Sequence, residues 1–311
     1  MALFPLRKRR KDKLFKYTKR DVIFYIALMA FSIAQFVIFY IVVNVNSLLL
    51  AFQNYDVLTN ITTYVGFDNF KEAFRILTTS SDMIDATKYS LLAFVLSTVI
   101  TTPLALLFSY YIYKKMLMSG FFRVLLFLPS IISAIIMVTI FRFFVERGVP
   151  EIANKLFGVE DVRGLLENPD TRFGMVMFYN IWVGFGINVL MYSNTMSGIS
   201  PDVIEAGRVD GVSGFKEFWY LIFPHVYSTF TTFLIVGVSG IFINQLNLYS
   251  FYGGSSPIQT YGYWIYVQTA NAKSKAEYPV ISAFGIIFTV IIVPVTFAVR
   301  KALVKFGPRE E

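Results

Sequence analysis

The sequence predicts an all-α membrane protein that crosses the bilayer about six times, with both termini in the cytoplasm. Of its 311 residues, 56% are hydrophobic and only 15% are charged, well below the roughly 25% usual in soluble domains. Several apolar runs are about 20 residues long, the length at which a helix spans the hydrocarbon layer. This composition excludes an ordinary cytosolic enzyme and a disordered chain. The absence of Cys excludes a disulfide scaffold and a thiolate metal site.

Six apolar runs are long enough to be helical spans. They cover residues 22–43, 89–113, 121–145, 173–196, 226–249 and 278–299. We expect Pro103, Pro129 and Pro294 to kink these helices without ending them, because neighbouring helices in a membrane can satisfy the freed carbonyl groups. The first run is too long for the apolar core of a cleaved signal peptide, so we expect it to be retained.

The distribution of Lys and Arg predicts the orientation. With six spans both termini lie on one side, and 18 of the 28 basic residues fall there. The positive-inside rule therefore places residues 1–21, the loop 198–225 and the tail 300–311 in the cytoplasm, with a transmembrane domain over residues 22–299. The basic run at residues 7–11 is typical of an anchor at anionic lipid, not of a nucleic-acid site.

Two loops on the opposite side, residues 44–88 and 146–172, are long enough to be structured. The second is rich in acidic residues. It is either a solvated cap of short helices or a docking surface for an extracytoplasmic partner.

The loop between the fourth and fifth runs carries the most specific pattern. Ser200 followed by Pro201 is typical of a helix N-terminus, and Gly211 can adopt the left-handed conformation that ends a helix. We expect a second helix to begin at Ser213 and to end at Pro224, giving a helix-turn-helix at the membrane surface. The first helix carries small side chains that would let another protein approach closely, namely Val203, Ala206 and Gly207. Charged side chains that could form hydrogen bonds around that contact are Glu205, Arg208 and Asp210.

This loop resembles the cytoplasmic signature of permease subunits of ATP-binding-cassette importers. That signature reads Glu-Ala-Ala, three residues, Gly, nine residues, then Ile-x-Leu-Pro. The residues in the same register are Glu205, Ala206, Gly207, Gly211 and Leu221-Ile222-Phe223-Pro224. Asp210 is also similar to the family. The departures are Gly207 for the second Ala, Leu221 for Ile and Phe223 for Leu, and each keeps the size class or the apolar character.

Two further segments resemble carbohydrate-type permeases. Phe122-Arg123 leading into Leu128-Pro129 is similar to the stretch that opens the third helix of that type. Residues 64–70, Tyr-Val-Gly-Phe-Asp-Asn-Phe, are similar to the segment that follows the first span in the maltose- and glycerol-phosphate-type first permease.

The resemblance implies a heterodimer with a second homologous permease, two cytoplasmic ATPase subunits and an extracellular or periplasmic solute-binding protein, in a bacterial cytoplasmic membrane. It implies that the ATPases move the loop and switch the bundle between inward-facing and outward-facing states. The residues it assigns to ATPase coupling are Glu205, Ala206, Gly207, Asp210, Gly211 and Pro224. The chain has no Gly-x4-Gly-Lys-Ser/Thr phosphate loop. We therefore expect no enzyme activity and no bound cofactor, with ATP and Mg on the partner ATPase.

Polar residues inside the fourth and fifth spans are candidates for binding the solute, because polar groups are costly within a membrane. These candidates are Asn180, Trp182, Asn188, Asn244 and Asn247. In the family these two helices line the sugar cavity, and amides with aromatic rings suit a neutral polyhydroxyl ligand. Hydrogen bonding between helices is the alternative role of the same amides.

We therefore predict the permease subunit of a binding-protein-dependent importer of an oligosaccharide or related sugar. A permease for another solute, such as a polyol phosphate, is the alternative within this class. An ion-coupled secondary transporter would need intramembrane acids and would leave the cytoplasmic loop unexplained. A passive membrane scaffold would give no transport phenotype on deletion.

Overall fold

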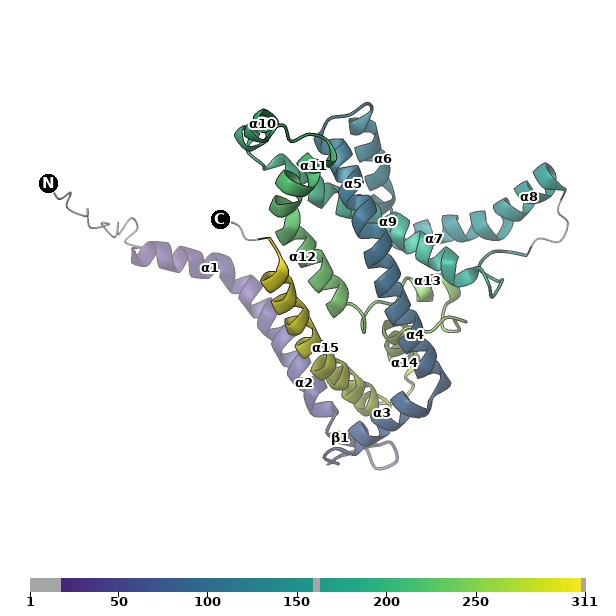
Figure 1. Ribbon diagram of the computed structural model, residues 1–311. Coiled ribbons are helices and arrows are strands. Elements are labelled where there is room, and N and C mark those ends of the chain that lie inside the picture. Colours follow the sequence, from purple (N-terminus) through teal and green to yellow (C-terminus); the bar gives the residue numbers. More distant parts are fainter. Residues whose placement is uncertain (1–17, 159–162, 309–311) are drawn as a thin grey trace. The chain divides into compact units, whose positions relative to one another are not determined.

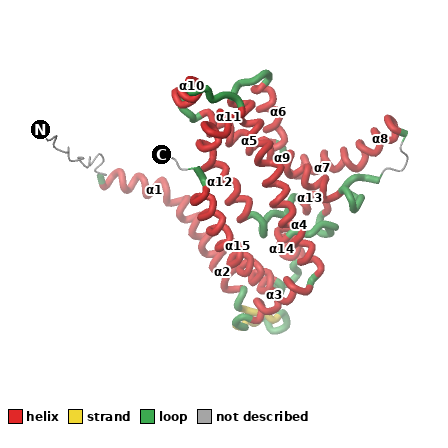
Figure 2. The backbone as a smooth tube through the Cα atoms, viewed as in Figure 1, coloured by secondary structure: helices red, strands yellow, loops and turns green. Residues whose placement is uncertain are grey.

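The computed structural model describes residues 18–158 and 163–308, which are mostly helical and contain one small β-hairpin (Figure 1, Figure 2). Within these residues, five helices are long and apolar enough to cross a membrane, and one bent pair can make a sixth span. The prediction of a polytopic all-α protein is confirmed. Residues 1–17 of the predicted basic segment and residues 309–311 of the tail lie outside the described residues.

The first span belongs to a separate unit that ends at Leu50. It is continuous through α1 (Lys19–Phe36), a π-helical turn (Val37–Val42) and α2 (Val43–Leu50). At 1.5 Å per residue its length is about 48 Å, which exceeds the roughly 30 Å of the hydrocarbon core. Thr18 caps its start: Thr18 Oγ1 accepts a hydrogen bond from the Asp21 backbone N–H, and Asp21 Oδ2 accepts one from the Thr18 backbone N–H.

The second unit begins at Ala51 and contains the other spans. One span joins α4 (Ser81–Leu96), a π-helical turn (Ser97–Thr101) and α5 (Thr102–Tyr113). The bent span joins α6 (Ser119–Ile131) to α7 (Ala134–Phe143), a π-helical turn (Phe144–Gly148) and α8 (Val149–Phe157). Two further spans are single helices, α9 (Arg172–Ser197) and α15 (Tyr278–Phe306). The remaining span joins α11 (Phe215–Glu217), a π-helical turn (Phe218–Ile222) and α12 (Phe223–Ser239). Helix α9 packs against α5, α6 and α12.

The third span is broken, whereas the sequence predicted one helix over residues 121–145. Helix α6 ends at Ile131, and α7 begins at Ala134 at an angle of 102°. Ile132 and Ser133 between them have non-helical backbone, with ψ of 143° and 132°. Pro129 provides no N–H to the last turns of α6. A kink is expected at this proline, and instead the helix ends completely two residues after it.

The fifth span begins and ends earlier than the predicted range 226–249. Pro224 does not end a helix, because it lies in the first turn of α12, where a residue without an N–H is tolerated. The helix stops at Ser239, and residues 241–247 are irregular. Two of them have left-handed backbone, Leu246 with φ of 51° and Asn247 with φ of 57°. Asn244 and Asn247 therefore lie on this irregular segment and not on a common helix face.

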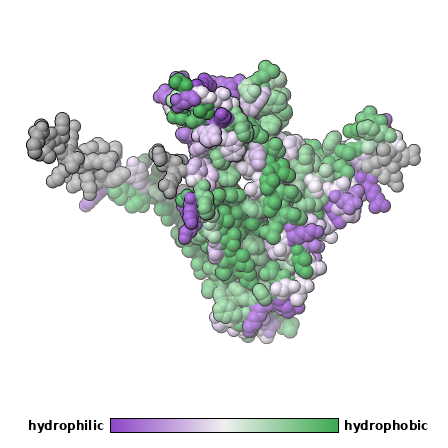
Figure 3. Space-filling view, in the orientation of Figure 1, coloured by the Kyte–Doolittle hydropathy of each residue, from purple (hydrophilic) through white to green (hydrophobic). Residues whose placement is uncertain are grey.

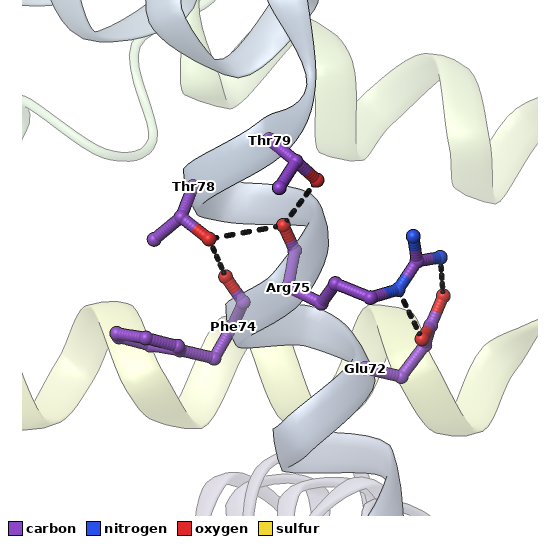
Figure 4. Close-up of polar contacts among 5 residues, drawn as sticks. All are labelled: Glu72, Phe74, Arg75, Thr78 and Thr79. Atoms are coloured by element: carbon purple, nitrogen blue, oxygen red, sulfur yellow. Dashed lines mark hydrogen bonds and ion pairs between the residues drawn. The ribbon is translucent and has the colours of Figure 1, made fainter.

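The loop after the first span is structured. Strands β1 (Gln53–Asp56) and β2 (Ile61–Tyr64) pair in antiparallel fashion, and α3 (Asp68–Thr79) follows them. On α3 the Arg75 guanidinium donates two hydrogen bonds to Glu72, at 2.9 and 2.6 Å (Figure 4). These bonds hold the pKa of the Glu72 carboxyl below its ordinary value. The Thr78 and Thr79 hydroxyls donate to backbone carbonyls one turn earlier, so this face of α3 is polar and self-paired.

Apolar side chains are exposed along the spans. Figure 3 shows apolar surface over the helices of the second unit and hydrophilic surface around α10 (Pro201–Val209). On α15 the exposed large side chains include Val290, Ile291, Val293, Val295 and Phe297. A soluble protein rarely exposes such a continuous apolar patch, so this surface indicates contact with lipid or with other membrane helices.

Candidate functional site

A cavity of about 260 Å³ lies among the helices of the second unit. Its lining comes from α4, α5, α9, α12 and the irregular segment that follows α12. The residues that line it are Ala93, Phe94, Ser97, Thr98, Thr101, Thr102, Asn180, Ile181, Gly184, Asn188, Phe233, Leu234, Val236, Gly237, Gly240, Ile241 and Asn244. None of these residues is charged. The cavity is therefore polar through amides and hydroxyls alone.

Asn180 lines this cavity, as predicted, but its side chain is engaged in the fold. Asn180 Nδ2 donates to the carbonyl oxygens of Val176 at 2.8 Å and Leu246 at 2.9 Å. Asn180 Oδ1 accepts a hydrogen bond of 2.9 Å from Asn247 Nδ2. These bonds attach the irregular segment 241–247 to α9. Asn247 does not line the cavity, and its amide serves this attachment.

Asn188 and Asn244 each have one side-chain group engaged by the protein and one that is not. Asn188 Nδ2 donates to the Gly184 carbonyl at 3.1 Å, and Asn244 Oδ1 accepts from the Leu246 backbone N–H at 2.9 Å. Within the described residues, Asn188 Oδ1 and Asn244 Nδ2 have no protein partner. Both residues line the cavity, so an acceptor and a donor remain available there.

The side of the cavity formed by α4 and α5 carries hydroxyl groups that the sequence analysis did not single out. They belong to Ser97, Thr98, Thr101 and Thr102. The first three lie on the π-helical turn between the two helices. The signal in the sequence is a group of hydroxyl residues directly before Pro103, within an otherwise apolar helix.

Trp182 lies outside the cavity lining. Its ring stacks on Phe178, with the ring centroids 6.5 Å apart, and lies 6.4 Å from Phe141 of α7. The sequence grouped Trp182 with the solute-binding residues, and the structure instead places it in an aromatic group between α9 and α7.

The loop between α9 and α12 contains the predicted short helix, α10. Ser200 Oγ accepts a hydrogen bond from the Asp202 backbone N–H at 3.3 Å, which is the expected N-cap. Gly211 has a φ of +79°, so it supplies the left-handed turn that favours glycine. The Val212 N–H then donates to the Gly207 carbonyl at 2.8 Å. The second helix of the loop continues without a stop into the fifth span.

The predicted coupling residues on α10 lie on two faces of that helix, while Gly211 follows α10 and Pro224 lies in the first turn of α12. Gly207 is buried, and a Cβ at this position would overlap the side chain of Leu221. Glycine here lets α10 pack closely on the helix that contains Pro224. The exposed residues around the end of α10 are Glu205, Ala206, Arg208, Val209 and Asp210. A partner that touches α10 would therefore contact this mixed charged and apolar face, and not Gly207.

The second unit is thus a bundle of candidate membrane spans with an uncharged polar cavity and a folded loop between two of its helices. Residues 102–309 match the family described as the binding-protein-dependent transport system inner membrane component. The chain belongs to this family. It is a multi-pass protein of the cytoplasmic membrane, and the family resemblance of the loop motif is confirmed.

Individual relatives are permeases of sugar transport systems. The chain is 23% identical over 265 residues to the galactooligosaccharides transport system permease protein GanP of Bacillus subtilis (strain 168), and this covers 80% of the chain and 62% of GanP. It is 26% identical over 255 residues to the arabinooligosaccharides transport system permease protein AraP of Halalkalibacterium halodurans, covering 80% of the chain and 78% of AraP.

The fold is similar to that of a chain in the crystal structure of a bacterial ABC transporter involved in the import of the acidic polysaccharide alginate. The TM-score is 0.71 at 22% sequence identity, covering 93% of this chain and 98% of that chain. At this identity the similarity concerns the fold alone.

Proposed function

We propose that this chain is the permease subunit of an ATP-driven importer that takes up a neutral oligosaccharide or related sugar delivered by a solute-binding protein. In this proposal it pairs with a second homologous permease and with two cytoplasmic ATPase subunits. Family membership supports the importer, and the sugar permeases GanP and AraP among its relatives support the solute class.

The observation that carries the proposal is the uncharged polar lining of the cavity. Sugar hydroxyls both donate and accept hydrogen bonds, and they match the free groups of Asn188 and Asn244 and the hydroxyls of residues 97–102. The rings of Phe94 and Phe233 in the same lining suit the C–H faces of a sugar. A polyol phosphate would favour a basic residue in the lining, so the neutral sugar is the better match.

Coupling to ATP hydrolysis would act through α10. The exposed residues Glu205, Ala206 and Asp210 would contact the ATPase, while Gly207 and Leu221 join α10 to the helix that continues into α12. Because α12 lines the cavity, a rigid displacement of α10 would change the cavity and support alternating access. ATP and Mg would be bound by the ATPase subunits, and this chain would act on the solute only by binding and release.

Reconstituted transport tests the proposal. The assembled complex in proteoliposomes, with its binding protein and a panel of neutral oligosaccharides, should show uptake that depends on ATP. The double variant Asn188→Ala/Asn244→Ala should lower uptake by about thirtyfold at subsaturating solute. This corresponds to the loss of two net hydrogen bonds of roughly 1 kcal/mol each.

Asn54→Ala is the matched control, because Asn54 is an exposed amide on β1 and does not line the cavity. It should leave uptake at the wild-type rate. Wild-type uptake by an assembled double variant would remove the cavity assignment. Uptake by the wild-type chain without ATPase subunits would contradict the importer class.

A further inference from the structure

A buried ion pair joins the end of α5 to the loop that contains α10. Lys114 Nζ lies 2.5 Å from Glu217 Oε1, although the two residues are 103 positions apart. The Glu217 side chain is 3% exposed and the Lys114 side chain 25% exposed. Among the described residues, the other three ion pairs join side chains three or four positions apart on exposed helix surfaces. The pair between Lys114 and Glu217 therefore differs from the other three in its burial and in the sequence separation of its two residues.

Neighbouring contacts reinforce the same junction. The Tyr110 hydroxyl donates to the Gly214 carbonyl at 3.3 Å, and the Tyr110 ring centroid lies 5.4 Å from that of Phe218. Lys114 Nζ also lies 5.6 Å from the Tyr110 ring centroid, within the range of a cation–π contact. The last turn of α5 is thus attached to residues 214–218 by polar and aromatic contacts together.

The burial of Glu217 makes the contact between α5 and the loop depend on one relative position of the two. A carboxylate that is removed from water is costly unless a counter-charge stays within hydrogen-bonding distance. Sliding of α5 past the loop would separate the two charges and leave Glu217 buried without its partner. The ion pair therefore favours one register between α5 and the loop, and it favours movement of both as one body.

The two helices that meet at this junction form two sides of the cavity. The helix that ends before Lys114 carries Thr101 and Thr102 in the cavity lining, about 18 Å along its axis at 1.5 Å per residue. The helix that contains Glu217 is continuous to Ser239 and carries Phe233 and Gly237 in the same lining. A displacement of the loop would reach both sides of the cavity through one junction.

We propose that Lys114 and Glu217 are positioning residues for transport, and that their ion pair makes α5 follow the loop when α10 is displaced. This inference rests on the proposed function, because it assigns the source of the displacement to an ATPase. Without the ion pair, the loop would still move α12 through Gly207 and Leu221. The side of the cavity that carries the hydroxyl groups, on α4 and α5, would then not follow this movement. ATP would then be hydrolysed without a matching change at the solute.

The test measures solute molecules imported per ATP hydrolysed by the full complex in proteoliposomes. Glu217→Gln and Lys114→Met keep the approximate size of each side chain and remove one charge. Each should lower this ratio by about five- to tenfold, at the low end of typical coupling between sites, while the complex still assembles and hydrolyses ATP. The reversed pair, Lys114→Glu with Glu217→Lys, should restore most of the ratio because it restores opposite charges.

Glu72→Gln is the control, since it breaks an exposed ion pair with Arg75 on α3 and should leave the ratio unchanged. A wild-type ratio in both single variants would overturn the role of the pair while leaving the importer intact. If the single variants fail to assemble, failure of the reversed pair to restore assembly and ratio would overturn it as well. A wild-type complex that imports nothing on ATP would contradict the proposed function itself, and this inference with it.

Discussion

At the scale of single residues, Gly186 sets how closely two spans approach. A Cβ at Gly186 of α9 would overlap the Leu126 carbonyl group and lie 2.9 Å from the Phe127 Cα of α6. Because these are backbone atoms, they cannot relieve the overlap by a change of side-chain rotamer. Gly186→Ala should therefore destabilise the protein by roughly 1–3 kcal/mol, as overpacking of a tight core does, and lower its thermal unfolding midpoint in detergent.

Gly174→Ala on the same helix is the matched control. No atom lies within 4 Å of a Cβ built at Gly174. Alanine favours a helix over glycine by up to about 1 kcal/mol, so this variant should unfold at the same temperature or slightly higher. Equal midpoints for the two variants would show that α6 and α9 are not in close contact at Gly186.

The amides show which parts of a site a sequence can predict. Polar residues in apolar spans indicated a solvent-accessible or hydrogen-bonded position, and Asn180, Asn188 and Asn244 do line one cavity. The sequence did not separate a ligand-binding amide from a structural one. An amide is structural where another polar group of the protein lies within hydrogen-bonding distance, as Asn247 does for Asn180. Which polar groups come that close is determined by the fold and cannot be read from the sequence. Solute binding by these residues stays a prediction.

At the scale of the elements, Asn69 attaches the β1–β2 hairpin to α3. Its buried Nδ2 donates to the Ala51 carbonyl at 3.0 Å and the Gln53 carbonyl at 2.8 Å. Asn69→Ala would leave both carbonyls without this donor, at a cost of roughly 1–3 kcal/mol. We expect faster hydrogen exchange in residues 53–64 of this variant, measured by mass spectrometry on the purified protein.

Thr63→Ala provides the comparison, because Thr63 lies on the same hairpin with an exposed side chain. Its exchange rates should equal those of the wild type. Unchanged exchange in Asn69→Ala would mean that strand pairing alone holds the hairpin. The motif at residues 64–70, which resembles a segment of carbohydrate-type permeases, thus has a structural role through Asn69.

Breaks in the helices were harder to predict than the helices themselves. Hydrophobic run length identified every span, because burial in lipid requires about the same length from each. The effect of each proline depended on its position within the hydrogen-bonding pattern. Pro129 precedes a complete break, whereas Pro224 lies in the first turn of α12, within a continuous helix. The irregular segment 241–247 has an apolar and amide composition that a run-length criterion cannot separate from a helix.

At the scale of the whole molecule, the described contacts connect the loop and the cavity through continuous helices. α10 lies at one end of the helix that continues into α12, and the cavity lies farther along the same helix. The junction at Lys114 adds the α4–α5 helix to this connection. The proposed mechanism would need few charged groups inside the membrane, because the displacement would come from outside the bilayer. This agrees with the uncharged lining of the cavity.

The proposed mechanism requires α10 and the β1–β2 hairpin to lie on opposite sides of the membrane, with α10 in the cytoplasm. The chain has no Cys, so a single introduced Cys reports its own position without background. Leu58 in the hairpin turn is 93% exposed, and Val209 on α10 is 88% exposed. In right-side-out vesicles a membrane-impermeant maleimide should label Leu58→Cys at once, and should label Val209→Cys only after permeabilisation. The unaltered chain serves as the blank. Labelling of Val209→Cys in sealed vesicles would place α10 outside and contradict the positive-inside assignment, since an ATPase in the cytoplasm could then not reach it.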